Sequence, residues 1–405
     1  MVKRIGIILF FFLACFVMTT EAKVNIFKDA ATAIKTKRNL RQSLDTLVGY
    51  GANDEAPLKE RARAYSVATE VCQCMYKVEN EKLYLKKSYD TTAFFNAILQ
   101  MYEFSLRCDS LEQRTDAGVK GKFKYRKSGA SLMRTHRTNL LNGGKWHANG
   151  KRYAEAFRFF DMYCSTDENA LCSFRPDTLY TRVAYRATLC AQAEGNNAGV
   201  LQYVDTALTL GTNGVFLHKY KAAALDAMGD TAAWFAALED GMRQYPRDTY
   251  FFATIMDHLR AQRKYDLAMA YAVEMNAKEP DITLYRYGRC LVNLDTEQWD
   301  KCIETADDVL AHDSLYADAW YNKGLSYVKR AIAFESTICL DLRDPQCKKD
   351  RAALKSLYND ARTAMERYRA LAPDSKDRWA PPLYHIYLNL NMGREFGEIE
   401  RILKR

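Results

Sequence analysis

The sequence has little proline, and its glycines are too few for a fold built on many tight turns. Its 405 residues include 8 prolines and 19 glycines. Strand-rich folds use both residue types in their turns, whereas helix interiors exclude proline and disfavour glycine. Hydrophobic residues make up 48% of the chain, so it has enough apolar surface to fold. The composition therefore favours long helices and an all-α fold.

The sequence also lacks the patterns of common catalytic and cofactor sites. Its six histidines are scattered, without His-Glu-x-x-His or another ligand pair at helical spacing. No G-x-G-x-x-G, P-loop or G-x-S-x-G pattern occurs. The acid pairs Glu239-Asp240 and Asp307-Asp308 fall on helix faces that we expect to be exposed, where a catalytic role is uncommon. We expect a protein that is not an enzyme and holds no metal or cofactor.

Residues 1–22 have the features of a secretion signal. Lys3 and Arg4 form a positive start, and an apolar run follows over positions 5–18. That run is shorter than the roughly 20 residues of a membrane span. Thr20 and Ala22 are small residues at the two positions that a signal peptidase reads. We predict cleavage after Ala22 and a periplasmic or secreted protein.

Two other interpretations of this segment stay open. The apolar run can act as an uncleaved anchor. Cys15 can instead carry a lipid, because Leu13-Ala14-Cys15 loosely resembles a bacterial lipobox, although Phe12 stands where a small aliphatic residue is preferred. No second long apolar run follows, so we expect no transmembrane segment in the mature chain.

The cysteines are expected to form disulfides if the chain is exported. Removing Cys15 from the eleven leaves an even number, which favours disulfides in an oxidising compartment. Two pairs are eight positions apart across a polar loop, Cys164 with Cys172 and Cys339 with Cys347. Closing so short a loop adds roughly 2–3 kcal/mol of stability in the chain-entropy account. Buried free thiols are the alternative.

Residues 23–116 form an N-terminal helical region, either a cap of the remaining array or a separate bundle. Amphipathic patterns at 28–48, 58–78 and 91–112 predict three helices. Asp90 precedes the third as an N-cap. The glycines and polar residues of 49–54 predict a break after the first.

Residues 117–152 contain ten lysines and arginines and no acid. The full chain has a formal charge of +9, so this segment outweighs the rest. We expect a solvated basic connector at 117–136. The alternative is a site for an anionic lipid, glycan or acidic protein of the cell envelope, and not for nucleic acid, because no stacking motif accompanies the charge. The basic patch that we single out is Lys120, Lys122, Lys124, Arg126 and Lys127.

Residues 137–405 form a repeat array, with a strict period of 34 over its middle part. Pro246 and Pro280 mark helix ends that far apart, and Ser314 follows after the same interval. Small residues and an aromatic recur at fixed distances before these markers, as helix pairs with close axes require. The recurring positions are Tyr265 and Trp299, Ala268 and Cys302, and Ala272 and Ala306.

One repeat is longer than the others. Pro373 lies 59 positions after Ser314, which is 25 more than the period. Residues 325–342 and 346–371 keep a helical pattern, so the insertion at about 328–357 should lengthen both helices by about three turns each. Asp344-Pro345 suits an N-cap and a first helical position.

These spaced units resemble the tetratricopeptide repeat (TPR) family over residues 130–405, as about seven helix pairs. Together with the signal and the block from Asn139 to Asp161, the chain looks like exported TPR proteins of Bacteroidota. The resemblance implies an α-solenoid that acts as a non-catalytic interaction scaffold. The Lys/Asn pattern with which some members bind a peptide carboxylate is missing, since Ala223 stands where an Asn is needed.

The resemblance also implies a groove lined by the first helix of each pair, which would bind an unidentified protein or peptide. Tyr285 or Tyr287 joins this surface, depending on the register. Tyrosines suit such a surface, although many of them can instead pack between neighbouring pairs. The implied groove residues are Tyr185, Lys219, Tyr250, Asp257, Arg260, Tyr321, Lys329, Tyr384 and Tyr387.

Overall fold

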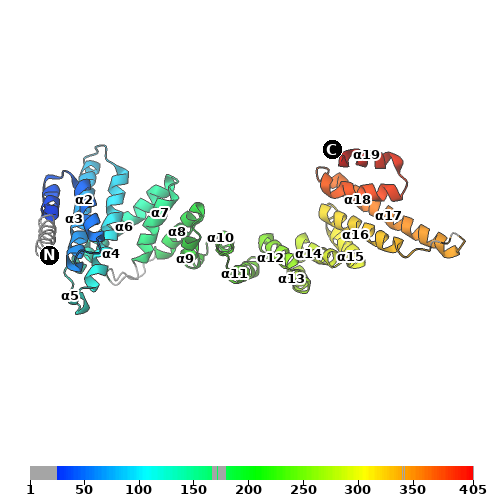
Figure 1. Cartoon of the computed structure of the whole chain (residues 1–405), viewed down its shortest axis with the longest axis horizontal. Helices are drawn as coiled ribbons and strands as arrows, with labels where there is room; N and C mark the ends of the chain where they lie inside the picture. Colours follow the sequence, from blue (N-terminus) through cyan, green and yellow to red (C-terminus); the bar gives the residue numbers. More distant parts are fainter. Residues whose placement is uncertain (1–24, 167–170, 172–178, 340, 342, 405) are drawn as a thin grey trace, which may run out of the picture. The chain divides into compact units, whose positions relative to one another are not determined.

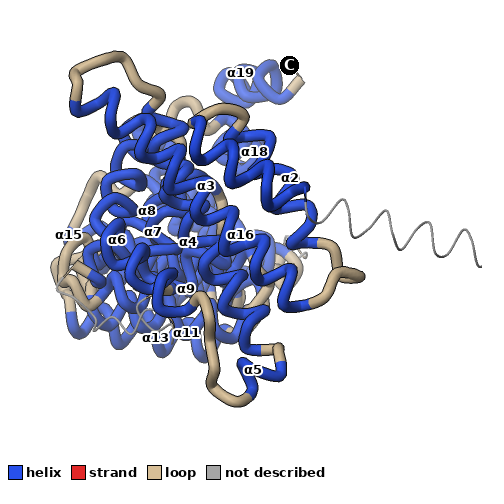
Figure 2. Tube along the Cα trace, turned by 90° about the vertical axis from the view of Figure 1, so that its left-hand side faces the viewer, coloured by secondary structure: helices blue, strands red, loops and turns tan. Residues whose placement is uncertain are grey.

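The computed structural model describes residues 25–166, 171, 179–339, 341 and 343–404. Within these residues every regular element is a helix (Figure 2), which confirms the all-α prediction. None of these helices is both long and apolar enough to cross a membrane. The predicted signal, its cleavage after Ala22, and Cys15 and Cys172 lie outside the described residues. The chain divides into two compact units, Met1–Met228 and Gly229–Arg405.

The first unit is a series of helices that pack mainly on their neighbours in sequence (Figure 1). A helical segment at 25–36 precedes the others. The remaining helices are α2 (Leu40–Ala52), α3 (Leu58–Tyr84), α4 (Thr91–Gln113), α5 (Asp116–Val119), α6 (Arg126–Asn149), α7 (Tyr153–Ser165), α8 (Tyr180–Glu194), α9 (Asn197–Leu208) and α10 (Gly214–Ala227).

Helices α3 and α4 begin where the sequence predicts. The Asp90 carboxylate accepts a hydrogen bond of 2.9 Å from the backbone N–H of Ala93, which confirms the predicted N-cap of α4. The single helix predicted over 28–48 is wrong. The chain turns between the segment at 25–36 and α2, where Lys37 and Asn39 have φ of 55° and 54°. Asparagine tolerates this left-handed conformation better than most residues.

The break predicted at 49–54 begins too early. Helix α2 runs through Gly49 and Gly51 and ends at Ala52. A Cβ added to Gly51 would lie 2.8 Å from the ring of Tyr65 in α3. This glycine therefore allows two helices to approach, rather than ending one of them.

The basic segment is more ordered than a connector. Helix α6 begins at Arg126, inside the range 117–136, and packs against α4 and α7. The Glu112 carboxylate accepts hydrogen bonds of 2.7 and 3.1 Å from the backbone N–H groups of Lys124 and Tyr125. These bonds fix the turn that leads into α6.

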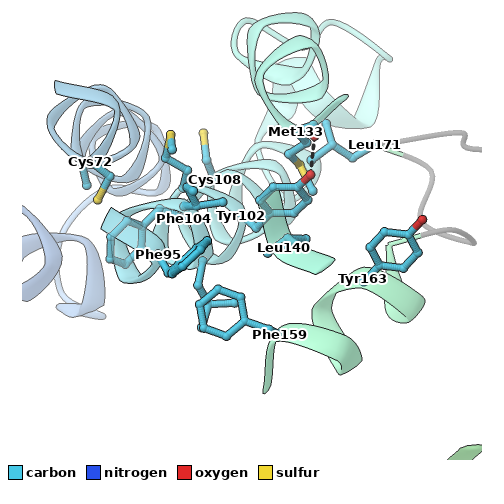
Figure 3. Close-up of a cluster of buried hydrophobic side chains, with 14 of the residues drawn as sticks. Cys72, Phe95, Tyr102, Phe104, Cys108, Met133, Leu140, Phe159, Tyr163 and Leu171 are labelled. Carbon is cyan, nitrogen blue, oxygen red and sulfur yellow. Dashed lines mark hydrogen bonds between the residues drawn. The ribbon is translucent and has the colours of Figure 1, made fainter. Parts of the chain in front are cut away.

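Aromatic side chains from α4 and α7, with Met133 and Leu140 from α6, form much of the core of the first unit (Figure 3). The rings of Phe95 and Phe159 meet edge to face with centroids 6.4 Å apart. The Tyr102 hydroxyl donates to the backbone carbonyl of Met133. A Cβ added to Gly143 would lie 2.6 Å from the Phe159 ring, and one on Gly144 would overlap the Phe160 ring. These two glycines thus let α6 and α7 pack closely.

The second unit is also a series of helices. Its helices are α11 (Thr231–Gln244), α12 (Thr249–Ala261), α13 (Tyr265–Lys278), α14 (Thr283–Asp295), α15 (Trp299–His312), α16 (Ala317–Glu335), α17 (Pro345–Leu371), α18 (Lys376–Asn389) and α19 (Gly393–Leu403). The first helices α12, α14 and α16 begin at positions 249, 283 and 317, and the second helices α11, α13 and α15 begin at 231, 265 and 299. Both series advance by the predicted interval, so the period is confirmed.

The small residues of the repeat lie where helices approach. Ala268, Ala272, Cys302 and Ala306 are all fully buried. A Cβ added to Gly241 of α11 would overlap the ring of Phe251 in α12. Small side chains at these positions therefore bring neighbouring helices together.

The structure confirms the long repeat, but most of its extra helical residues belong to α17 rather than α16. Helix α16 has 19 residues and α17 has 27, against 13 in α14 and 14 in α15. The prediction that both helices gain about three turns is wrong, because α16 ends at Glu335. Asp344 caps α17 through a 2.8 Å hydrogen bond from the Gln346 N–H, and Pro345 occupies the first turn, as predicted.

The cysteine spacing did not reveal one close pair of thiols in the second unit. Cys339 and Cys347 are free thiols in the structure, so their bridge stays a prediction. Cys290 of α14 and Cys302 of α15 are both fully buried, with their sulfur atoms 3.6 Å apart. These two are twelve positions apart in sequence, and the helix hairpin brings them together.

The close helix contacts predict opposite effects for two glycine substitutions in the first unit. Gly144→Ala should lower the free energy of unfolding by about 1–3 kcal/mol, because its Cβ would overlap the Phe160 ring. Gly49→Ala, whose Cβ meets nothing within 4 Å, should raise it by about 0.5–1 kcal/mol. Denaturant unfolding of both variants measures the difference. Equal changes in the free energy of unfolding of the two variants would contradict the role of Gly144 in close helix packing.

The paired thiols predict a specific cross-link. Oxidised glutathione should convert the Cys290 and Cys302 thiols to one disulfide, with two glutathione thiols released, because only a small shift separates 3.6 Å from bonding distance. Mass spectrometry of the digested, unreduced protein should find this linked peptide in wild type and in Cys339→Ser, and not in Cys302→Ser. Its absence from oxidised wild type would contradict the prediction.

Candidate functional site

The first helices of the second unit carry three of the predicted groove residues on their surface. The Tyr250 side chain of α12 is 38% exposed. Asp257 of the same helix and Lys329 of α16 are exposed as well. All three side chains are therefore accessible to solvent.

Arg260 is accessible only in part, because it is already paired. Its guanidinium donates two hydrogen bonds to the Asp295 carboxylate, of 2.5 and 3.2 Å. Both side chains are 24% exposed, and a weaker contact of 3.7 Å joins Arg260 to Asp257. The bidentate pair connects α12 with α14, so Arg260 fixes two consecutive first helices in place.

Tyr321 belongs to a second link between first helices. The guanidinium carbon of Arg378 lies 4.1 Å from the centroid of the Tyr321 ring, and its Nη1 donates to Asp318 at 2.7 Å. The ring of Tyr368 from α17 lies 5.1 Å from that of Tyr321. Arg378 therefore connects α18 to α16, and Tyr321 keeps only part of its surface.

Several predicted tyrosines pack inside the array instead of lining a surface. Tyr387 is 2% exposed and donates a 2.9 Å hydrogen bond to Glu366, so its assignment to the groove is wrong. Tyr384 is half-buried against Phe396, with centroids 4.6 Å apart. Tyr285 and Tyr287 are both buried, so neither register puts a tyrosine on the surface there.

Leucines occupy the surface positions that the sequence analysis missed. Leu284, Leu291 and Leu294 of α14 stand one repeat period after Tyr250, Asp257 and Arg260, and they are half-buried. Leu325 of α16 follows Leu291 by the same interval. The repeat period could have identified them. We call Tyr250, Asp257, Leu284, Leu291, Leu294, Tyr321, Leu325 and Lys329 the first-helix face.

In the first unit two predicted groove residues occupy equivalent positions of α8 and α10. Tyr185 and Lys219 are both half-buried and lie one repeat period apart. The Tyr185 hydroxyl accepts a 2.7 Å hydrogen bond from the Asn213 amide. The Lys219 ammonium lies 6.0 Å from the centroid of the largely exposed Phe216 ring. Tyr185 also packs against an aliphatic cluster that includes Val200, Val204 and Leu217.

The predicted basic patch divides into one structural residue and four surface residues. Arg126 forms hydrogen bonds of 2.6 and 3.0 Å with the buried Asp109 and stacks 3.5 Å from the Phe123 ring centroid. The others are exposed, and none of them forms an ion pair with an acid of the described part of the chain. These four are Lys120, Lys122, Lys124 and Lys127.

The repeat period of the helices and the contacts between neighbouring helices together identify the type of repeat. Helix pairs that recur with this period are the arrangement of the tetratricopeptide repeat. The helix pairs of this chain are TPR-like repeats. No group of three or more His, Cys, Asp or Glu side chains that could hold a metal occurs among the residues described.

Comparison with known proteins finds similar folds among solved structures of TPR proteins. No family model matches the sequence, and no curated protein matches it either. A TPR repeats protein from Bacteroides fragilis is similar over 66% of this chain and 98% of its own, with 15% identity and a TM-score of 0.32. The C-terminal part of a TPR repeat-containing protein from Cytophaga hutchinsonii is similar over 63% and 91%, with 10% identity and a TM-score of 0.41. Identities this low carry no inference about a partner.

We expect the ion pair between Arg260 and Asp295, which joins α12 to α14, to contribute measurably to the stability of the fold. Asp295→Ala should lower the free energy of unfolding by about 1 kcal/mol or more, because it leaves the half-buried Arg260 guanidinium without its bidentate partner. Glu274→Ala, which removes an exposed pair with Lys278 within one helix, should cost less than about 0.5 kcal/mol. If both variants lose the same free energy of unfolding in denaturant, the Arg260–Asp295 pair contributes no more than an exposed pair within one helix.

Proposed function

We propose that this chain is an exported, non-catalytic scaffold that binds a protein or peptide segment along the first-helix face. The observation that carries the proposal is the recurrence of accessible side chains at the same repeat positions of consecutive first helices. A chain lying along this face would meet equivalent positions in each repeat. Repeat arrays commonly use such extended surfaces for binding.

The chemistry of the face suits a polypeptide. Its centre is aliphatic, with Leu284, Leu291, Leu294 and Leu325 half-buried. Charged and aromatic side chains flank the leucines. Apolar centres with polar edges are typical of protein interfaces, and tyrosine is enriched among the residues that dominate binding energy.

The ion pairs between first helices support the same proposal. The pair between Arg260 and Asp295 connects α12 to α14, and that between Asp318 and Arg378 connects α16 to α18. A surface that is already fixed loses less conformational entropy when a partner binds. The face therefore favours a flexible partner that orders on a rigid support.

The exported location rests on the N-terminal sequence alone. Lys3 and Arg4, the apolar run of 5–18 and the small residues before position 23 support a cleaved signal. In this view the partner is a component of the cell envelope or the medium.

A second candidate function has a specific observation in its favour. Four exposed lysines at 120, 122, 124 and 127 gather around the start of α6, without acidic partners in the described part of the chain. Such a cluster attracts anionic lipid or glycan. Arg126 does not belong to this surface, since Asp109 binds it.

A selected peptide would test the first-helix face. A random-peptide phage library is screened against the full mature chain, and the affinity of a selected peptide is measured by fluorescence anisotropy. The variant Tyr250→Ala/Asp257→Ala/Lys329→Ala should raise its Kd tenfold or more, which is about 1.4 kcal/mol. All three side chains are exposed, so the variant should fold.

The matched control changes three exposed side chains of second helices. Val273→Ala/Lys301→Ala/Glu304→Ala should leave the Kd unchanged. Equal affinities of wild type and both variants would contradict the proposal.

Vesicles distinguish the second candidate function. If anionic phosphatidylglycerol vesicles sediment the wild type but not Lys120→Gln/Lys122→Gln/Lys127→Gln, while no peptide is selected, the basic patch is the functional site. If phosphatidylcholine vesicles sediment both proteins equally, charge at the patch has no part in binding.

A further inference from the structure

The C-terminal end of α3 carries three consecutive large apolar side chains on its surface. Leu83 is 43% exposed, Tyr84 is 87% exposed and Leu85 is 52% exposed. Single exposed apolar residues are ordinary on a protein surface, but contiguous ones mark contact surfaces. No other run of three exposed large apolar residues occurs in the described part of the chain. This end of α3 is therefore a candidate surface for contact with another molecule.

The backbone holds these side chains in a fixed turn. After α3 ends at Tyr84, Lys86 adopts a left-handed φ of 55°. The backbone N–H of Lys87 donates to the Lys82 carbonyl at 2.9 Å, and that of Lys86 donates to the Leu83 carbonyl at 3.0 Å. These two bonds are those of the Schellman motif, which closes a helix. The turn is thus formed before any partner binds, so little conformational entropy is lost on binding.

Lysines flank the apolar side chains on both sides, with Lys82 before them and Lys86 and Lys87 after them. We call residues 82–87 the α3 tip. In a Schellman motif the positions of Lys82 and Lys87 often hold two apolar residues in contact. Lysines at both positions leave the apolar residues of the tip without this local cover. The helix dipole favours cations at a helix C-terminus, but it does not account for the apolar residues between them.

The chain around the turn at 37–39 adds positive charge beside the α3 tip. The Lys37 ammonium donates a 2.9 Å hydrogen bond to Glu81, which brings this turn to the end of α3. Lys35 and Arg38 are both exposed. Segments 35–38 and 79–90 together contain six lysines and arginines and three acids. The charge of the region is therefore positive.

All three acids of this region already have partners. Glu81 pairs with Lys37, and Glu79 pairs with Lys82 at 2.6 Å and accepts the backbone N–H of Asp90 at 2.9 Å. The Asp90 carboxylate caps α4. The hydrogen bond and charge of Lys37, with a smaller effect of Lys87, lower the pKa of the Glu81 carboxyl, which stays ionised and paired.

Two lysines of the tip remain available to an anionic partner. Lys86 and Lys87 are exposed, and neither forms an ion pair with the residues that the structure describes. Lysine is depleted from the centres of protein interfaces, so a protein partner is disfavoured. Aliphatic side chains, a tyrosine and lysines instead suit the interface of a bilayer. There a tyrosine keeps its hydroxyl near the headgroups, and lysine stems extend their ammonium groups to lipid phosphates.

We propose that the α3 tip docks on an anionic phospholipid bilayer, with Leu83, Tyr84 and Leu85 in its interfacial region and Lys86 and Lys87 at its phosphates. One turn with three apolar side chains gives reversible, peripheral binding. The α3 tip shares no residue with the first-helix face, and neither proposal depends on the other.

The α3 tip is also distinct from the lysines at 120–127. Helices α3 and α4 form a hairpin, and those lysines follow the far end of α4. At 1.5 Å per residue, the 23 residues of α4 separate the two regions by roughly 35 Å. Variants of one region therefore leave the other unchanged.

Sedimentation with vesicles tests the proposal. The protein is the chain from Lys23 onward, which keeps the apolar run of 5–18 out of the measurement. Phosphatidylglycerol vesicles should bind the wild type at least tenfold more tightly than phosphatidylcholine vesicles. Leu83→Ser/Tyr84→Ser/Leu85→Ser should weaken binding to phosphatidylglycerol tenfold or more. Lys86→Gln/Lys87→Gln should weaken it too and reduce its dependence on salt, because fewer charges meet the lipid.

A matched control removes three exposed apolar side chains elsewhere. Met228→Ser/Val273→Ser/Leu315→Ser should bind phosphatidylglycerol vesicles like the wild type. The changed side chains of both serine variants are exposed, so both should keep the circular dichroism spectrum of the wild type.

Three results would overturn the proposal. The first is no binding of the wild type to phosphatidylglycerol vesicles. The second is equal vesicle binding by the wild type and Leu83→Ser/Tyr84→Ser/Leu85→Ser, above all if Lys120→Gln/Lys122→Gln/Lys127→Gln abolishes it. The third is self-association of the wild type in sedimentation velocity without lipid, lost in the tip serine variant, together with no vesicle binding. A second copy of the chain would then cover the α3 tip.

Discussion

The array depends on the contact between a residue without a large side chain on one helix and a ring or thioether on its neighbour. Gly144 faces Phe160, Gly241 faces Phe251, and Gly324 of α16 lies under the end of Met365. Such contacts bring helix axes close while burying large apolar groups, which supplies most of the stabilisation. Because each contact fixes how one helix lies on the next, it also determines which residues remain on the surface of the first helices.

The features that depend on local sequence could be predicted. The repeat period, the capping by Asp90 and Asp344 and the position of Pro345 need only neighbouring residues or regular spacing. The same period identifies where a surface position lies in each repeat. It does not say whether a residue of the next repeat covers that position, and this is why Tyr387 was wrongly placed in the groove and the pairing of Arg260 was missed.

In the N-terminal helices, local sequence predicts even less of the structure. The turn at Lys37–Asn39 has no glycine or proline to mark it, and an amphipathic pattern continues across it. A cavity of about 330 Å³ in the first unit is lined by residues of three helices, such as Glu70 of α3 and Ser105 of α4, which are far apart in sequence. No spacing rule connects them, because the cavity exists only after α3, α4 and α6 have packed. Serine and threonine within a helix otherwise predict only a solvated face.

The first-helix face limits what kind of partner can bind there. Its leucines are already half-buried against the core of their own repeats, so each has little apolar surface left to bury. At about 25 cal/mol per Å², one repeat therefore contributes little binding energy. Useful affinity requires contacts with several repeats at once, which a small molecule cannot make and an extended polypeptide can. The ion pairs that hold successive first helices in place would keep those contacts in register, so under the proposed function the stability of the array and the affinity for a partner depend on the same links.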